Sequence, residues 1–356
     1  MAVTSTTLGQ ACTLKAGKFV AANDITDEYR DGLFPCYGGN GIRGYVTEYS
    51  HEGEYPLIGR QGALCGNVNF ASGKFRATEH AVAVQPNVQM NIRWLYYKLL
   101  SMDLGQYATG AAQPGLAVAK LEQLPFVIPS LEEQERLSTL CDQVEVLISF
   151  RKQQIAKLDE LVKARFVEMF GDPVLNPFGW KKSALESNAT LLNGRAYKQD
   201  ELLDEGKYPV LRVGNFFSNR GWYYSDLELD DEKYCNNGDL LYAWSASFGP
   251  QIWNGGKVIY HYHIWKVLVG AAYDKQFLCK LLEYATESLM EDTHGIAMMH
   301  LTKSGMEQTE FIVPPLNLQH QFAAFVAQTD QQKLTIQHSL AKLELLKKAL
   351  MQKYFG

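Results

Sequence analysis

The chain contains two copies of one sequence plan, and this internal repeat limits its possible folds more than any other feature. Residues 126–134 read FVIPSLEEQ, and residues 311–319 read FIVPPLNLQ, at an offset of 185 residues. A phenylalanine, a proline, a leucine and a glutamine recur in register between the two segments. The same offset pairs Gly171 with Gly356, so the second copy ends where the first copy ends.

The repeat extends upstream with small changes of offset. Residues 57–66 (LIGRQGALCG) align with residues 240–249 (LLYAWSASFG) at an offset of 183, and His80 then falls on His263. Loop insertions absorb such shifts without changing a fold. We therefore expect two diverged halves built on the same plan.

Each half, about 1–171 and 172–356, opens with a region rich in strand signals. Short apolar runs, such as YPLIG and HAVAVQP in the first half and YPVLRV and KVIYHYHIWKVLV in the second, alternate with glycine and asparagine. Such runs and breakers at close spacing are typical of strands and turns. A short helix is predicted after them, at 91–100 and at 275–285.

Each half then closes with a long helical segment. Its start is marked by the proline of IPSLEEQ or VPPLNLQ, and the first segment contains no proline or glycine from Leu131 to Phe170. Apolar residues recur every three to four positions. A helix of about 40 residues is roughly 60 Å long, more than one small β domain can cover. We therefore expect the two helices to pair as an antiparallel coiled coil, in preference to two separate core-covering helices.

These patterns predict an α+β fold: two tandem β-rich domains, each followed by a long helix, related as a pseudo-two-fold internal repeat. The predicted boundaries are 1–130 and 172–315 for the β-rich domains and 131–171 and 316–356 for the helices. The residues predicted to pack between the helices are Leu137, Leu140, Val144, Leu147, Ile155, Leu158, Val162, Phe322, Phe325, Ile336, Leu340, Leu343, Leu346 and Leu350.

Neither a metal site nor a membrane span is predicted. The six cysteines form no CxxC pair and are expected to be reduced thiols in the core. His261 and His263 would share one face of a strand, but a metal needs further ligands nearby. No apolar run reaches about 18 residues, and the opening MAVTSTTLGQ lacks a secretory signal. A cytoplasmic protein is therefore expected.

Three segments carry a resemblance to a known family. They are FVIPSLEEQERL with its repeat FIVPPLNLQHQF, then KLDELVKARFVEMFGDPVLNPFGW at 157–180, and LIGRQGALCGNVNF at 57–70. With these segments the chain resembles, over essentially its whole length, the specificity subunits of type I restriction–modification systems. No single short motif is diagnostic, but the ordered set, present twice, is specific.

The resemblance implies a role without catalysis. Each β-rich domain would be a target-recognition domain that reads one half of a split, asymmetric site on double-stranded DNA, and the paired helices would act as a ruler. Two methyltransferase subunits would bring S-adenosylmethionine, and restriction subunits would bring ATP- and Mg-dependent translocation and cleavage. No cofactor is expected in this chain. Gly110 and Gly295 and the other shared positions would be scaffold.

Base-reading residues are expected where the two halves differ. Arginine, lysine, asparagine and glutamine read base edges in the major groove best, with serine as a weaker reader, and aromatic side chains such as Tyr223, Tyr224, Trp244 and Trp253 could wedge or stack. His80 and His263 are interpreted as structural histidines inside apolar strands. The candidate DNA-binding residues are Asn40, Arg43, Arg60, Gln61, Lys74, Arg76, Arg212, Asn215, Asn219, Arg220, Trp244, Ser245, Gln251, Asn254 and Lys257.

Two alternative functions stay open at this point, and a third is disfavoured. The net charge of −5 argues against strong DNA binding by this chain alone, so partner subunits would supply much of the phosphate contact. The chain could instead be the specificity chain of a related two-subunit restriction–modification system, or a scaffold in which paired helices assemble other proteins. A self-contained methyltransferase is disfavoured, because the sequence offers no cofactor loop. GNGIRG at 39–44 formally matches the dinucleotide-binding fingerprint, but the strand-like YVTEY follows it and not a helix.

Overall fold

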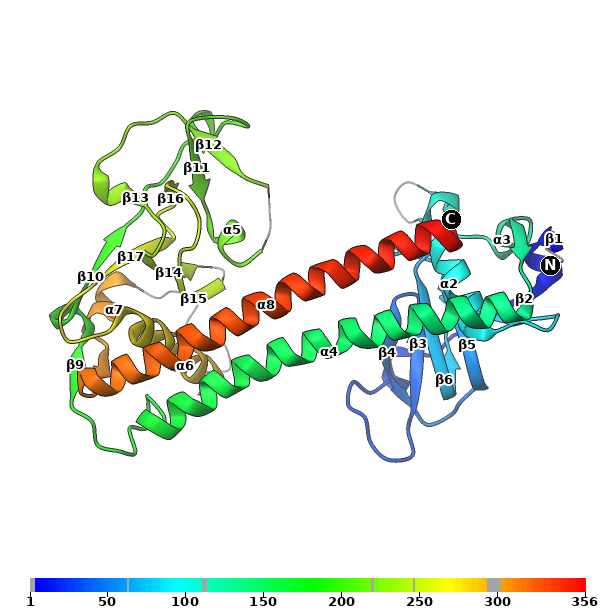
Figure 1. The fold of residues 1–356 in the computed structure, drawn as a ribbon, viewed down its shortest axis with the longest axis horizontal. Helices are drawn as coiled ribbons and strands as arrows, with labels where there is room; N and C mark the ends of the chain where they lie inside the picture. The colour runs from blue at the N-terminus through cyan, green and yellow to red at the C-terminus, as the bar shows by residue number, and fades with distance from the viewer. Residues whose placement is uncertain (1–3, 63, 111–113, 219–220, 246, 293–301) are drawn as a thin grey trace. The chain divides into compact units, whose positions relative to one another are not determined.

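The computed structural model divides the chain into two compact units, residues 1–153 with 337–356 and residues 154–336. Each unit therefore takes one part of each long helix, α4 and α8 (Figure 1). None of the helices in the described part of the chain combines the length and the apolar character that a membrane crossing requires. The described residues are 4–62, 64–110, 114–218, 221–245, 247–292 and 302–356.

The two long helices confirm the prediction from the sequence. Helix α4 spans Leu131–Phe170 and helix α8 spans Leu316–Tyr354. At the start of α4, the Ser130 hydroxyl accepts a hydrogen bond from the Glu133 amide at 3.3 Å, which satisfies a donor that the helix leaves free. Glu132 and Glu133 lie in the first turn, where the helix dipole favours negative charge.

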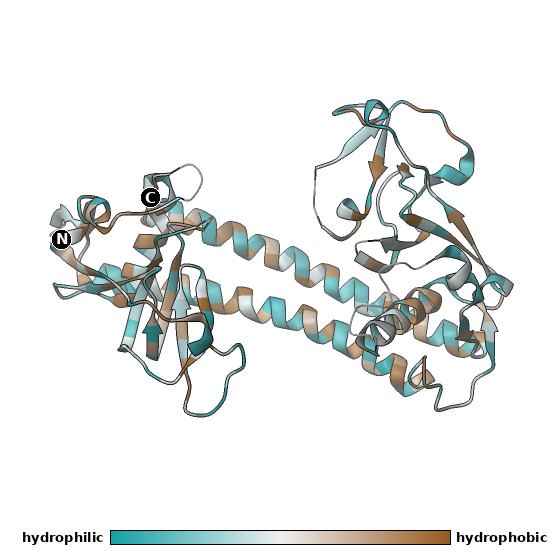
Figure 2. Ribbon diagram, turned by 180° about the vertical axis from the view of Figure 1, so that it is seen from behind, coloured by the Kyte–Doolittle hydropathy of each residue, from teal (hydrophilic) through white to brown (hydrophobic). Residues whose placement is uncertain are grey.

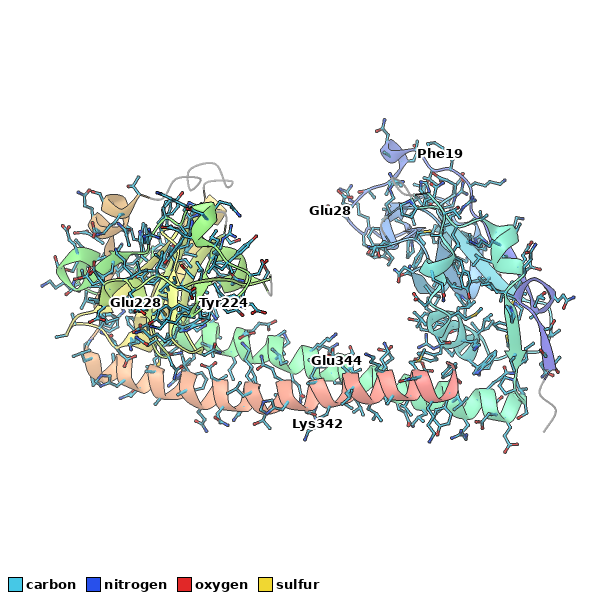
Figure 3. All side chains as sticks on the ribbon, turned by 90° about the horizontal axis from the view of Figure 1, so that it is seen from above. Phe19, Glu28, Tyr224, Glu228, Lys342 and Glu344 are labelled. Atoms are coloured by element: carbon cyan, nitrogen blue, oxygen red, sulfur yellow. The ribbon has the colours of Figure 1, made fainter. Side chains whose placement is uncertain are left out.

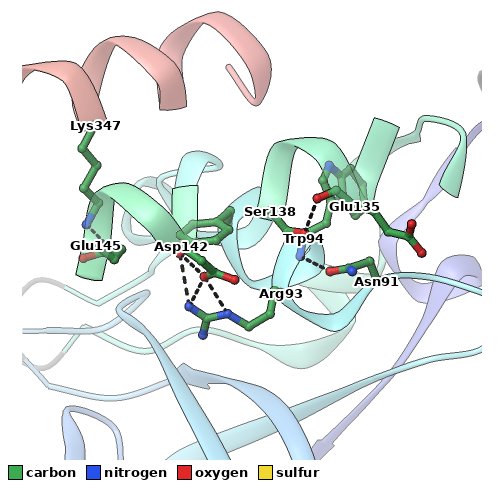
Figure 4. Close-up of polar contacts among 9 residues, drawn as sticks. Asn91, Arg93, Trp94, Glu135, Ser138, Asp142, Glu145 and Lys347 are labelled. Atoms are coloured by element: carbon green, nitrogen blue, oxygen red, sulfur yellow. Dashed lines mark hydrogen bonds and ion pairs between the residues drawn. The ribbon is translucent and has the colours of Figure 1, made fainter. Parts of the chain in front are cut away.

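The two helices run antiparallel where they pair within each unit. In the first unit, residues that come later on α4 contact residues that come earlier on α8. The paired side chains are half-buried or exposed, so these ion pairs define the direction and register of the helices more than their stability. The ion pairs are Lys347–Glu145 (2.5 Å; Figure 4) and Lys152–Glu344 (3.5 Å; Glu344 is labelled in Figure 3) in the first unit, and Lys333–Asp159 (2.5 Å) in the second.

Leu147 and Leu346 differ from the prediction that they pack between the helices. They are 46% and 45% exposed, so they lie off the buried seam. The seam on the first part of α4 has spacings of four, three and four residues, as a helix face in a coiled coil requires. The other predicted packing residues are buried or half-buried. The seam residues on the first part of α4 are Leu137, Cys141, Val144 and Ile148.

The β-rich part of the first unit is one six-stranded sheet with a short two-stranded sheet beside it. The larger sheet has the strand order β2-β7-β5-β6-β3-β4, and β1 pairs with β8. The long strand β6 belongs to both halves of the larger sheet, because it pairs antiparallel with β5 and parallel with β3. The strands are β1 (Thr4–Thr7), β2 (Cys12–Ala16), β3 (Phe34–Gly38), β4 (Gly41–Val46), β5 (His51–Gly59), β6 (Val68–Ala77), β7 (Ala81–Pro86) and β8 (Pro125–Ile128).

The second unit has the same plan, but its larger sheet is divided into two. Its sheets have the orders β10-β17-β14-β15 and β12-β11-β16-β13, and β9 pairs with β18. Strands β15 and β16 take the place of β6, and β16 pairs parallel with β11 as β6 does with β3. The strands are β9 (Lys182–Ala184), β10 (Ala189–Asn193), β11 (Tyr208–Leu211), β12 (Tyr223–Ser225), β13 (Tyr234–Cys235), β14 (Leu240–Ser245), β15 (Ser247–Ile252), β16 (Val258–Tyr260), β17 (Ile264–Val269) and β18 (Glu310–Ile312).

Short helices cover the sheets. The two predicted from the sequence are present as α2 and α6. In the first unit, the Asn91 side chain caps α2 by accepting from the Trp94 amide at 2.9 Å, and Arg93 joins α2 to Asp142 on α4 (Figure 4). The helices are α1 (Leu8–Ala11), α2 (Ile92–Ser101), α3 (Val118–Glu122), α5 (Val213–Phe217), α6 (Lys275–Asp292) and α7 (Lys303–Gln308).

The long helices contribute to the cores of both β-rich domains. In the first unit, Phe355 at the end of the chain stacks on Trp94, with 6.5 Å between the ring centroids. In the second unit, Phe166 of α4 and Phe322 of α8 pack edge to face at 5.5 Å and contact Phe277 of α6. Apolar residues alternate with polar residues along both helices (Figure 2). Each long helix therefore both packs against the other long helix and buries side chains in a domain core.

A buried glutamine near the start of each long helix makes the same contacts in both units. The Gln134 amide accepts from the Asn91 backbone at 2.9 Å and donates to the Pro129 carbonyl at 2.9 Å. The Gln319 amide accepts from the Asp274 backbone at 2.9 Å and donates to the Pro314 carbonyl at 2.7 Å. Both side chains are fully buried. The repeated proline and glutamine therefore join α4 to the start of α2 and α8 to the start of α6.

Replacing Gln319 with leucine is expected to destabilise the second unit by about 1–3 kcal/mol, because the Asp274 amide and two carbonyls, of Pro314 and Ala272, lose buried partners. Denaturant titration measures the loss, and faster hydrogen exchange at the Asp274 amide localises it. Gln331→Leu, at an exposed position on the same helix, is the matched control. Equal stability of the two variants would contradict the role assigned to Gln319.

Candidate nucleic-acid interface

A tight turn occupies the same place in both β-rich domains. Ala81 N donates to Thr78 O at 3.0 Å, and Ile264 N donates to His261 O at 2.9 Å. The carbonyl of a histidine in each turn accepts a hydrogen bond from an amide near the end of β5 or β14. His80 O accepts from Arg60 N and His263 O accepts from Trp244 N, both at 3.0 Å. The alignment of His80 with His263 therefore holds in space. Both residues lie in the turn before β7 or β17, and not inside strands as the sequence predicted.

A hollow of about 570 Å³ lies beside this turn in the first unit. The loop between β3 and β4 forms one wall, and His80 and the segment after β5 form the other. Three candidate residues, Asn40, Arg43 and Gln61, line it together, and all three are exposed. The Asn40 side-chain oxygen accepts from Asn67 at 3.1 Å, which orients its amide.

Close backbone contact fixes the wall of this hollow. A Cβ atom on Gly59 would lie 2.1 Å from the Gly39 carbonyl oxygen, a distance that only glycine avoids. Gly41 has φ of +103° and so adopts a conformation that favours glycine. The glycines of GGNGIRG therefore shape the β3–β4 loop, and they do not form a nucleotide-binding loop.

The second unit has a hollow of about 660 Å³ at the equivalent place. Thr78 N donates to Tyr37 O and His261 N donates to Leu211 O, both at 2.9 Å, so the loops that follow β3 and β11 leave the turn at corresponding points. Candidate residues Arg212 and Asn215 line this hollow. The further lining residues are Val213, Gly214, Gly221, Trp222, Tyr223, His261 and His263.

The other described candidate residues are not among those that line the two hollows. Trp244 is part of the core edge: it stacks on Trp265 at 5.7 Å, and its indole NH donates to Tyr262 O at 2.8 Å. Lys257 lies over the Tyr234 ring at 3.9 Å. The candidates outside the lining are Arg60, Lys74, Arg76, Trp244, Ser245, Gln251, Asn254 and Lys257, whereas Asn219 and Arg220 lie outside the described residues.

Histidines are the lining residues that the sequence analysis assigned elsewhere. His80, His261 and His263 all line a hollow. The sequence marked two of them, because the alignment of His80 with His263 indicated equivalent positions. It did not indicate that their side chains line a hollow. Within the described ranges, no cluster of three or more histidine, cysteine, aspartate or glutamate residues could hold a metal ion.

The histidines of the second hollow are neutral at neutral pH. Burial, followed by the nearby His263 and Arg212, lowers the pKa of His261 to about 4. Burial, then Arg212, also lowers the pKa of His263. Neutral imidazoles offer one donor and one acceptor each. The surface of this hollow can therefore recognise a ligand by directional hydrogen bonds, with Arg212 as the cation among its lining residues.

The stability of the second unit is expected to fall as the pH drops from about 6.5 to about 4. In that window the unfolded chain binds a proton at His261, whereas the folded chain does so only near a pKa of about 4. Denaturant midpoints measured across these pH values should fall for the wild type and fall less for His261→Gln. His320→Gln, at an exposed site on α8, should follow the wild type. Identical slopes for wild type and His261→Gln would contradict the prediction.

Comparison with known proteins points to one family. A family model described as a type I restriction modification DNA specificity domain matches residues 3–160 and again residues 177–345. The EcoprrI specificity subunit of Escherichia coli is 49% identical over 142 residues, which cover 40% of this chain and 35% of that protein. The MjaIX specificity subunit of Methanocaldococcus jannaschii is 22% identical over 377 positions, covering 92% and 87%. The double match confirms the resemblance and the internal repeat.

A solved structure has the same fold. The S subunit of a type I restriction–modification system from M. genitalium aligns with a TM-score of 0.63 at 16% identity, covering all of this chain and 96% of that one. At this identity the comparison supports the fold alone. It agrees with two β-rich domains that are each followed by a long helix.

Proposed function

Because the chain belongs to the family defined by the type I restriction–modification DNA specificity domain, which it contains twice, we propose that it reads a bipartite, asymmetric DNA site. Each β-rich domain contacts one half-site through the hollow beside its turn. The chain acts as a non-catalytic specificity subunit and directs partner subunits to the DNA.

The observation that carries this proposal is that the two hollows share a position but differ in lining. The first presents Asn40, Arg43 and Gln61, whereas the second presents Arg212 beside two histidines. Arginine pairs best with guanine, and asparagine and glutamine pair best with adenine, in the major groove. Two sites on one scaffold with different donors and acceptors suit a target whose two halves have different sequences.

The partners are double-stranded DNA, two adenine methyltransferase subunits and restriction or translocase subunits. S-adenosylmethionine, ATP and Mg belong to those partners. The net charge of −5 supports this division, because proteins that hold DNA by themselves usually present a basic surface. The paired helices α4 and α8 would fix the number of bases between the half-sites, as rigid dimers fix half-site spacing. A related two-subunit system would use the same specificity chain.

Replacing Asn40, Arg43 and Gln61 together with alanine is expected to relax reading of one half-site and leave the other intact. Each lost base contact lowers discrimination by about 1–3 kcal/mol. The variant is expressed with its methyltransferase partner, and the methylated adenines of the host DNA are mapped by sequencing.

Lys15→Ala is the control, because Lys15 is exposed on β2, at the opposite edge of the sheet from β3 and β4, and is not among the residues that line the hollow. Methylation with both half-sites still read, or with both half-sites lost, would contradict the assignment of one hollow to one half-site. Unchanged assembly with the partner would show in either case that the variant is folded.

A further inference from the structure

Arg212 differs from Arg165 and Arg195, the other two arginines described in its unit, in having no acidic partner. Arg165 pairs with Glu168 at 2.8 Å and Arg195 pairs with Glu201 at 2.7 Å. Among the residues that the structure describes, no carboxylate lies within 4 Å of the Arg212 guanidinium. A guanidinium that faces a hollow without a neutralising carboxylate is available for an acceptor from outside the chain.

The Arg212 side chain is held by its neighbours without being covered. It follows β11, and its guanidinium carbon lies 5.2 Å from the centre of the Tyr223 ring. Tyr223 is fixed in turn by strand pairing with Val210. Stacking on an aromatic face limits the rotamers of arginine and leaves the outer N–H groups free to donate in the ring plane. The guanidinium therefore loses little conformational freedom when it binds.

Asn215, the other candidate in this hollow, is used by the protein itself. Its side-chain oxygen accepts from Arg212 N at 3.3 Å, and its amide nitrogen donates to Gly221 O at 3.2 Å. These contacts hold the loop after β11 in shape. Asn215 is therefore a positioning residue for Arg212. Of these two residues, Arg212 is the one that we expect to contact a base.

We infer that Arg212 reads a guanine, donating to its O6 and N7 atoms from the major groove, in the half-site bound by the second unit. This inference rests on the proposed function. The lining residues include no acid, so no carboxylate of the hollow competes with a ligand for the Arg212 N–H groups. Guanine presents two such acceptors side by side, and arginine is the residue that pairs with both. The DNA phosphate is the other source of paired acceptors.

The test uses the assembled complex of this chain with its methyltransferase partner and duplexes that carry its methylation site. Each guanine of the half-site is replaced in turn by 7-deazaguanine, which lacks the N7 acceptor. One such replacement should weaken binding to the wild-type complex. A whole bidentate arginine–guanine contact provides about 5- to 150-fold in affinity, and this is the upper limit of the expected loss. For Arg212→Gln, the unmodified duplex should already bind more weakly, and that same replacement should cause no further loss.

Arg165→Gln is the matched control, because it removes the same charge from an exposed ion pair outside the hollow. It should retain the full sensitivity to 7-deazaguanine. Three results would overturn the inference: a half-site without guanine, equal sensitivity of Arg212→Gln and wild type to every replacement, or weakening that is independent of sequence with a salt dependence reduced by about one phosphate contact.

These outcomes separate the inference from the proposed function. If Arg212→Gln keeps full guanine discrimination while the triple variant of the first hollow still relaxes its half-site, the recognition role stands and the assignment of Arg212 fails. If neither variant changes any base preference, the proposed function fails as well.

Discussion

Two buried glutamines fix how each β-rich domain is attached to its long helix. Each side-chain amide accepts with its oxygen from the backbone NH of the residue just before α2 or α6, and donates with its nitrogen to a carbonyl at the proline boundary. A buried amide that loses a partner is costly, so these hydrogen bonds hold the start of each long helix against its own domain. The recurrence of proline and glutamine 185 residues apart is therefore explained by one structural requirement met twice.

On this shared scaffold, the two domains differ at the sheet edge beside the turn. Strand β6 is continuous in the first unit, whereas β15 and β16 replace it in the second, with Trp253 and a glycine-containing turn between them. The backbone bonds that hold the turn are equivalent in both units, and the loops beside it differ in length and composition. Divergence is therefore concentrated where it changes the hollow and spares the contacts that maintain the fold.

The sequence predicted the helices better than the site, and the reasons are physical. Period and proline boundaries are local signals, so both long helices begin where they were expected. The exact seam depends on contacts between distant residues, which select Cys141 and Ile148 over the neighbouring leucines. Residue type alone also does not reveal direction: Trp244 was a candidate reader but stacks on Trp265, whereas Arg212 faces the hollow. The split of β6 arises from pairing between remote strands, which no local pattern shows.

The chemistry of the second hollow is compatible with the negative charge of the chain. Its histidines are neutral because burial lowers their pKa values, and its cation among the lining residues is Arg212. Such a surface distinguishes bases by the direction of its donors and acceptors, and it gains little from the phosphate backbone. A chain with a net charge of −5 can then select a sequence without holding DNA tightly by itself. Affinity, in the proposed complex, comes from the partners, so that binding is strong only where recognition and catalysis are assembled on the same site.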